Sequence, residues 1–301
     1  IGLHRAWVTN QRHHRKRQRD RLPISPRKKL EGGLANSLQL DAVMLKVRII
    51  PTLLWSGFGL VKGTQFDPWR RVGPVVPAIE VYAKRDVDEL MILDIDQSKD
   101  KMTKPDLVSI SDFVRSCNVP LTYGGGIAHV SDAVDIIQAG ADKILINSHQ
   151  YTNRGLISEL AVKLGSQAVV VGIDVKRDSS GKPIVFSHCG TTQQEIGPSE
   201  AAKIAQQEGA GEIVITSIDR DGTMEGYDLD LIREITEVAK IPVIASGGAR
   251  DAECFVKAVQ EANASAVAAG AMFHFTELTP DDARITMSAH GIPVRRVLHD
   301  A

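Results

Sequence analysis

Two stretches of this chain, Val119-Pro-Leu-Thr-Tyr-Gly-Gly-Gly-Ile127 and Ile241-Pro-Val-Ile-Ala-Ser-Gly-Gly-Ala249, are near copies that lie 122 residues apart. Each is a short apolar run that ends in glycines and precedes a helical pattern, which is typical of a βα unit whose strand is buried on both faces. A second pair, Leu90-Met-Ile-Leu-Asp-Ile-Asp96 and Ile213-Val-Ile-Thr-Ser-Ile-Asp219, repeats at nearly the same interval. The repeat predicts two related halves of four βα units each, and therefore a single α/β fold of the (β/α)8 TIM-barrel type.

Outward from these stretches, short apolar runs alternate with helical patterns along the chain. The strands are expected at 47–54, 89–95, 121–123, 143–146, 168–173, 212–217, 243–245 and 266–269. The segment from Trp55 to Trp69 contains several glycines and is expected to be a loop, and 182–187 is expected to be a hairpin arm. Because active sites of such barrels lie at the carboxyl ends of the strands, the residues that end each strand are the candidates for function.

Composition narrows the class of protein. A hydrophobic content of 43% is enough for a core, and no apolar run approaches the ~18 residues that span a bilayer. Three scattered cysteines, Cys117, Cys189 and Cys254, have no metal-ligand spacing, so they are expected to be reduced thiols of a cytoplasmic enzyme with no metal and no cofactor.

The charge is unevenly distributed. Residues 1–43 hold ten Lys or Arg against three Asp or Glu, while the whole chain has a net charge of −1. A basic arm for nucleic acid or a membrane surface is one interpretation, and a solvated extension outside the fold is the other. We expect the extension, with the barrel over 44–301 and with neither nucleic acid nor membrane as a partner.

Glycine-rich turns follow the third and seventh expected strands. Without Cβ atoms, Gly125, Gly126, Gly247 and Gly248 let backbone N–H groups approach phosphate oxygens, and the helix that follows adds its positive N-terminal end. Tight βα turns also use glycine for steric reasons alone, so it is the symmetric pair that predicts a ligand with a phosphate at each end. The residues expected to complete the two pockets are Asn147, Ser148, Asp221, Gly222, Thr223, Gly270 and Ala271.

Asp174 ends the fifth expected strand, where its carboxylate would project into the barrel mouth. It is the candidate general acid or base, with a pKa tuned by partial burial. The other interpretation is an aspartate that caps a helix or anchors a loop. Asp94 and Asp221 fit a structural and a functional role equally well.

Four charged residues mark the opposite ends of the strands: Arg48, Glu89, Lys143 and Glu212. Each occupies or immediately precedes the start of an expected strand, and their charges sum to zero. They are either solvated, as charges at strand ends usually are, or paired with one another in a ring at the bottom of the barrel.

At these residues the chain resembles a known family, the cyclase subunit of imidazole glycerol phosphate synthase from histidine biosynthesis. The resemblance runs from Met44 to about Phe275 and is carried by Arg48-Ile-Ile-Pro51, Tyr123-Gly-Gly-Gly-Ile127, Thr216-Ser-Ile-Asp-Arg-Asp-Gly-Thr223 and Phe273-His-Phe275. It implies a glutaminase subunit bound to the N-terminal face of the barrel and a diphosphorylated substrate at the other face. It also implies that the four charges form an ammonia gate and that Lys62 contacts substrate.

One departure from the family concerns catalysis. The resemblance implies two catalytic aspartates, of which Asp174 matches the second, while the first falls on Leu54. A leucine cannot transfer a proton. At Leu54 and in the segment Asp221–Asp228, the chain resembles a paralogous branch of the family that is associated with sugar amidation in surface-polysaccharide synthesis.

Four functions therefore remain open at the level of sequence. The first is the sugar-amidation branch, which we expect because of Leu54, and the second is the genuine cyclase of histidine biosynthesis. A phosphoribosyl isomerase of the same pathway would also be a duplicated barrel, but it would not need the four-charge ring. A non-catalytic ammonia conduit is the fourth.

Overall fold

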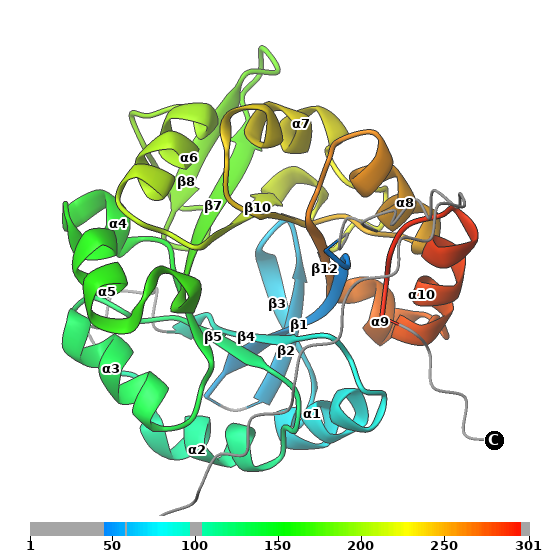
Figure 1. The fold of residues 1–301 in the computed structure, drawn as a ribbon, viewed down its shortest axis with the longest axis horizontal. Coiled ribbons are helices and arrows are strands. Elements are labelled where there is room, and N and C mark those ends of the chain that lie inside the picture. The colour runs from blue at the N-terminus through cyan, green and yellow to red at the C-terminus, as the bar shows by residue number, and fades with distance from the viewer. Residues whose placement is uncertain (1–44, 58, 97–103, 296–301) are drawn as a thin grey trace, which may run out of the picture. The chain divides into compact units, whose positions relative to one another are not determined.

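The computed structural model describes residues 45–57, 59–96 and 104–295. The expected basic extension over 1–43 lies outside the described residues. Within them, strands and helices alternate as the repeat predicts, and Figure 1 shows the helices in a ring around the strands.

Eight parallel strands of the described chain close into a barrel. They are β1 (Arg48–Ser56), β4 (Leu90–Asp94), β5 (Leu121–Gly124), β6 (Lys143–Ile146), β7 (Val169–Arg177), β10 (Glu212–Ser217), β11 (Val243–Ser246) and β12 (Ala266–Ala269). Each pairs with the next in this order, and the pairing of β1 with β12 closes the ring, with Ile49 opposite Val267. The predicted (β/α)8 fold is confirmed.

Helices cover the outside of the barrel. They are α1 (Val75–Lys84), α2 (Leu107–Arg115), α3 (Val130–Gln138), α4 (His149–Thr152), α5 (Leu156–Leu164), α6 (Pro198–Gln207), α7 (Leu229–Val238), α8 (Ala252–Gln260), α9 (Ala271–Phe275) and α10 (Pro280–Ala289). Local sequence sets several of their starts. The Asp228 carboxylate accepts from the Leu231 N–H at the start of α7, and Thr279 and Asp282 form a reciprocal capping box at the start of α10.

Two hairpins extend the carboxyl ends of the barrel strands. The expected loop from Trp55 to Trp69 is wrong, because β1 continues to Ser56 and β2 (Gly59–Thr64) and β3 (Asp67–Gly73) follow it as antiparallel strands. The glycines suggested a loop, but main-chain pairing to the extended β1 holds this segment as a hairpin. The expected second arm is present as β8 (Pro183–Ser187), which pairs with the end of β7.

The core has two layers because side chains alternate across a strand. On β1, Ile49 and Leu53 face the helices and belong to the large outer cluster. Ile50 points into the barrel, where a smaller cluster fills the lumen; its other members are Met91, Leu145, Val170, Val214, Ile244, Ala266 and Ala268. The lumen is therefore packed at mid-height, as in other barrels of this kind.

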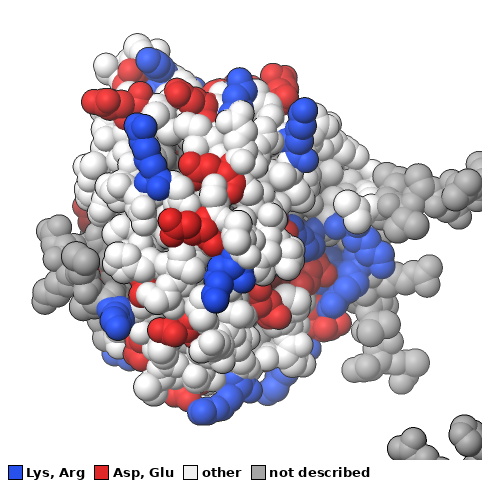
Figure 2. Space-filling view, turned by 60° about the vertical axis from the view of Figure 1, so that its left-hand side comes forward, with Lys and Arg blue, Asp and Glu red and all other residues white. Residues whose placement is uncertain are grey.

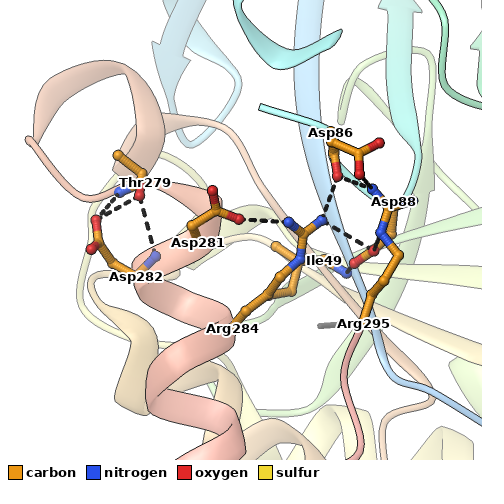
Figure 3. Close-up of polar contacts among 8 residues, drawn as sticks. All are labelled: Ile49, Asp86, Asp88, Thr279, Asp281, Asp282, Arg284 and Arg295. Carbon is orange, nitrogen blue, oxygen red and sulfur yellow. Dashed lines mark hydrogen bonds and ion pairs between the residues drawn. The ribbon is translucent and has the colours of Figure 1, made fainter. Parts of the chain in front are cut away.

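A polar cluster ties the last helix to the first strand (Figure 3). Arg284 of α10 is 3% exposed and pairs with Asp281 at 2.6 Å and with Asp88 at 3.1 Å. Asp88 also accepts from the Ile49 N–H at 2.9 Å and pairs with Arg295 at 3.3 Å. This cluster fixes the start of β1 beside the segment that leads into β4.

Candidate active site

A cavity of about 330 Å³ opens where the barrel strands end. Its wall contains most of the residues that the sequence singled out, from both halves of the repeat. Those residues are Lys62, Gly125, Gly126, Asn147, Ser148, Asp174, Asp221, Gly222, Gly247, Gly248, Gly270 and Ala271. Thr223 is not part of this wall: its hydroxyl donates to the Arg220 carbonyl at 2.9 Å and accepts from the Glu225 N–H, so it shapes the turn instead.

The two glycine turns have matching geometry. Gly125 has φ +126°, and a Cβ there would lie 2.4 Å from the Asp94 carbonyl oxygen at the end of the neighbouring strand β4. Gly247 has φ +86°, and a Cβ there would lie 2.6 Å from the Ser217 carbonyl oxygen at the end of β10. Only glycine fits either position, and both glycines line the cavity.

Asp174 lies in the wall between these turns, on β7. Its Oδ2 accepts a hydrogen bond from the Asn147 side-chain amide at 2.8 Å. Burial raises the pKa of Asp174 to about 7, and the nearby Asp221 carboxylate adds to the rise, although Asn147 and Thr216 favour the ionised form. A carboxyl with a pKa near neutrality can both donate and accept a proton, which suits a general acid or base.

The β2–β3 hairpin lies across the cavity, and Figure 1 shows it across the middle of the ring of helices. Its tip is held by main-chain atoms of the turn after β10, with the Gln65 N–H donating to the Asp221 carbonyl at 2.7 Å and the Gln65 side chain to the Asp219 carbonyl at 2.8 Å. Phe66 and Trp69 reach the cavity wall and stack on each other with ring centres 6.2 Å apart. The hairpin thus covers the site with aromatic side chains.

Leu54, also in the cavity wall, makes one side of the site apolar. It is 7% exposed and packs with Val61 of the hairpin and Ile95 after β4. The resemblance places an aspartate at this position, and the leucine supplies neither a proton nor a hydrogen bond there. Asp174 therefore has no carboxylate counterpart at residue 54.

Lys62 is the single lysine or arginine among the described residues that line the cavity. It is 3% exposed, and no carboxylate of the described residues pairs with it. Gly270 allows its close approach, since a Cβ at that glycine would lie 2.7 Å from the Lys62 ammonium. A buried ammonium without a partner is costly, and an anion bound at the Gly270 turn would neutralise it.

Below the lumen, the four charges that the sequence singled out do form a closed ring. Glu89 lies 2.5 Å from Arg48 and 2.8 Å from Lys143, while Glu212 lies 3.0 Å from Arg48 and 3.1 Å from Lys143. Glu89 is 2% exposed and also accepts from the Thr122 hydroxyl. Burial lowers the pKa of Arg48, but Glu212 and Glu89 outweigh it, so this pKa is raised and Arg48 stays charged.

The ring and the cavity lie on one axis because of the two-residue period of a strand. On β6, Lys143 belongs to the ring, Leu145 to the lumen, and Asn147, just after the strand, to the cavity wall. The same steps lead from Glu89 to Met91 on β4 and from Glu212 to Val214 on β10. Side chains two residues apart share a face, so the ring residues point into the barrel rather than outward.

The cavity-wall residues that sequence reasoning missed include two aromatic residues, two histidines and a cysteine: Phe66, Trp69, His149, His188 and Cys189. Phe66 and Trp69 belong to the segment that was expected to be a loop. His188 and Cys189 follow β8, and the hairpin arm expected over 182–187 was a signal that the chain returns to the strand ends there. His149 directly follows the predicted Asn147-Ser148 pair.

The described residues hold no cluster of three or more His, Cys, Asp or Glu side chains that is arranged to bind a metal ion. No helix among them has the length and apolar character needed to cross a bilayer. Figure 2 shows basic and acidic side chains interspersed on the face that it draws, without a broad basic patch.

These features define a duplicated (β/α)8 barrel with a titratable carboxyl in its mouth. Residues 48–279 match the model of the family described as histidine biosynthesis protein, and the chain belongs to this family. It is 42% identical over 254 residues to the imidazole glycerol phosphate synthase subunit HisF of Hyphomonas neptunium, and this match covers 84% of the chain and all of that relative. The resemblance to the cyclase-subunit family is thus confirmed.

Proposed function

We propose that this barrel is the ammonia-using subunit of an imidazole glycerol phosphate synthase-type enzyme, which binds a ligand with two phosphates in its mouth. The observation that carries the proposal is the alignment of the charge ring, the lumen and the cavity on one barrel axis. Two glycine turns supply anion sites on either side of Asp174, whose pKa of about 7 suits proton transfer.

The ring supports an origin for the ammonia at the N-terminal face. The ion pairs of Lys143 with Glu89 and Glu212 can be broken and re-formed by a small shift of the lysine side chain. An apolar plug, in contrast, would have no polar group to interact with ammonia. A glutaminase subunit bound beneath the ring is the partner that fits this arrangement. The name of the relative, a subunit of a synthase, is consistent with such a complex.

The activity that we propose first is that of the cyclase of histidine biosynthesis, because the family and the relative both carry histidine-pathway names. A second candidate is the delivery of ammonia for sugar amidation, and the observation that favours it is Leu54. With leucine in the cavity wall, proton transfer on that side of the substrate has no acid or base.

The test supplies the family's substrate and ammonium salts directly, so that no partner is needed. Positioned acid–base groups contribute about 10²–10⁴-fold in rate, so Leu54→Asp should raise cyclisation by at least tenfold over a slow wild type. Leu54→Asn is the matched control, since it is polar and of similar size but cannot exchange a proton. Wild-type turnover equal to that of a HisF cyclase would exclude the amidation branch, and no turnover by wild type or Leu54→Asp would exclude the cyclase.

A further inference from the structure

The two anion sites differ in their positive charge. Lys62 lies beside the Gly270 turn, at the end of the cavity built from the second half of the repeat. Because it is the only lysine or arginine of the described cavity wall, the site at Gly125, Gly126 and Ser148 has no such cation. The cavity-wall side chains there that can donate an N–H hydrogen bond to a phosphate include the imidazoles of His149 and His188.

His188 is held against this site by its own backbone. Its N–H donates to the Ser148 hydroxyl oxygen at 2.9 Å. Since that oxygen already accepts a hydrogen bond, the Ser148 proton is available to a ligand in the cavity. The backbone of His188 therefore holds the Ser148 hydroxyl, a hydrogen-bond donor, in the cavity wall.

The ring of His188 is also oriented. The Gln194 side-chain amide donates to the Ser187 hydroxyl at 2.7 Å, and this hydroxyl lies 2.9 Å from His188 Nδ1. The fully buried Ser187 hydroxyl keeps its own proton and can donate it to Nδ1. In the tautomer in which it does so, Nδ1 is an acceptor and the ring proton resides on Nε2, which is left as a donor.

The turn that follows β8 has a left-handed backbone at three successive residues. His188 and Cys189 have φ of +50° and +53°, and Gly190 follows at +78°. A left-handed conformation costs free energy in residues with a side chain, and such costs concentrate at functional sites. His149, in contrast, has no hydrogen bond from its ring among the described contacts, and burial lowers its pKa.

We infer that His188 is a ligand-binding residue that donates its Nε2–H to the phosphate held at Gly125, Gly126 and Ser148, as the counterpart of Lys62 at the other end. This inference deepens the proposed function and rests on its claim that the ligand carries two phosphates. It also assigns the His188–Gly190 turn a role in ligand selection. A phosphate is favoured over an uncharged group at this end because the glycine turn, the Ser148 hydroxyl and the His188 ring line the same cavity and can all donate hydrogen bonds.

The test uses inorganic phosphate as the probe and the full chain as the protein. Phosphate is titrated against the wild type, His188→Phe, His188→Asn and the matched control His290→Phe, a half-exposed histidine outside the cavity wall, with crystals soaked in phosphate to assign the two sites. A hydrogen bond to a charged group contributes roughly a factor of ten or more. We expect His188→Phe to weaken the site at Gly125 by about tenfold, His188→Asn to restore part of the loss, and His290→Phe to change it less than threefold.

A second measurement does not depend on the fold of a variant. Long-range proton–nitrogen NMR spectra of the wild type should show the His188 proton on Nε2, and added phosphate should shift that resonance. Equal phosphate affinity in wild type and His188→Phe, or a ring protonated on Nδ1 alone, would overturn the inference and leave the proposed function standing. Wild-type protein that binds phosphate at neither site would overturn both.

Discussion

Removal of Glu89 is the sharpest test of the charge ring, because this residue is the most buried of the four. It is 2% exposed and contacts two cations, Arg48 at 2.5 Å and Lys143 at 2.8 Å, as well as the Thr122 hydroxyl. Glu89→Ala leaves both cations with Glu212 as their single carboxylate partner among the described residues. The variant is therefore expected to lose much of the pairing that makes the buried charges tolerable.

The magnitude follows from that burial. Removing one partner of a buried ion pair costs about 3–5 kcal/mol. The lower end applies here, since Arg48 is 24% and Lys143 16% exposed and both retain Glu212. We expect a loss of about 3 kcal/mol in the free energy of unfolding, or a fall in Tm of about 6–12 °C for a domain of this size.

Equilibrium urea unfolding of the full chain measures this loss. Glu89→Gln should cost less, because its amide oxygen can still accept from Thr122. Arg115→Ala is the matched surface control: the Arg115–Asp112 pair is 76% and 54% exposed, and its loss should change stability by less than about 0.5 kcal/mol. A Glu89→Ala variant within 1 kcal/mol of the wild type would refute the claim that the ring is a coupled, buried unit.

Further predictions concern the ring, the carboxyl and the hairpin. In the presence of a glutaminase partner, Lys143→Glu should uncouple glutamine hydrolysis from product formation, which a comparison of glutamate and product yields measures; unchanged coupling would contradict the proposed ammonia route. The pKa of Asp174 is raised in the folded state, so the fold binds its proton more tightly than the unfolded chain, and this contribution to stability is lost as pH rises from about 4 through about 7. Asp174→Asn should accordingly be more stable than the wild type at pH 8, by up to about 4 kcal/mol, and equal to it near pH 4; a difference that does not depend on pH would rule out this cause. Gly222→Ala should displace the hairpin and weaken phosphate binding at least tenfold, since its Cβ would lie 2.2 Å from the Gly63 carbonyl oxygen at φ +74°, and crystals of the variant with the hairpin in place would contradict this.

The fold was predictable because the signals for it are local and repeated. Each barrel strand is an apolar run bounded by glycine, proline or a carboxylate, and the predicted ranges agree with the observed strands to within a few residues. The segment after β1 was not predictable in this way. Gly57, Gly59 and Gly63 indicate a loop, whereas the extension of β1 to Ser56 offers an edge on which β2 pairs.

The candidate site was predictable where glycine and strand ends mark it, and not where tertiary contacts create it. Gly125 and Gly247 could be predicted because they occupy matching positions in the two duplicated stretches. His188, in contrast, follows a short strand and reaches the site only because β8 turns back along β7 toward Ser148. The ring was visible as four charges at strand starts, but their closure depends on strands that are far apart in sequence, so spacing alone left solvation and pairing equally plausible.

The cluster at Arg284 has a consequence for how the chain folds during its synthesis. Asp88 and Arg284 are 196 positions apart, and the start of β1 pairs with Ala266–Ala269 of β12. While the ribosome is still producing the second half, β1 therefore presents an unpaired edge, which is the kind of surface that invites association between nascent chains. Closure of that edge requires β12, and burial of Arg284 requires α10, so both wait until the last part of the barrel has left the ribosome.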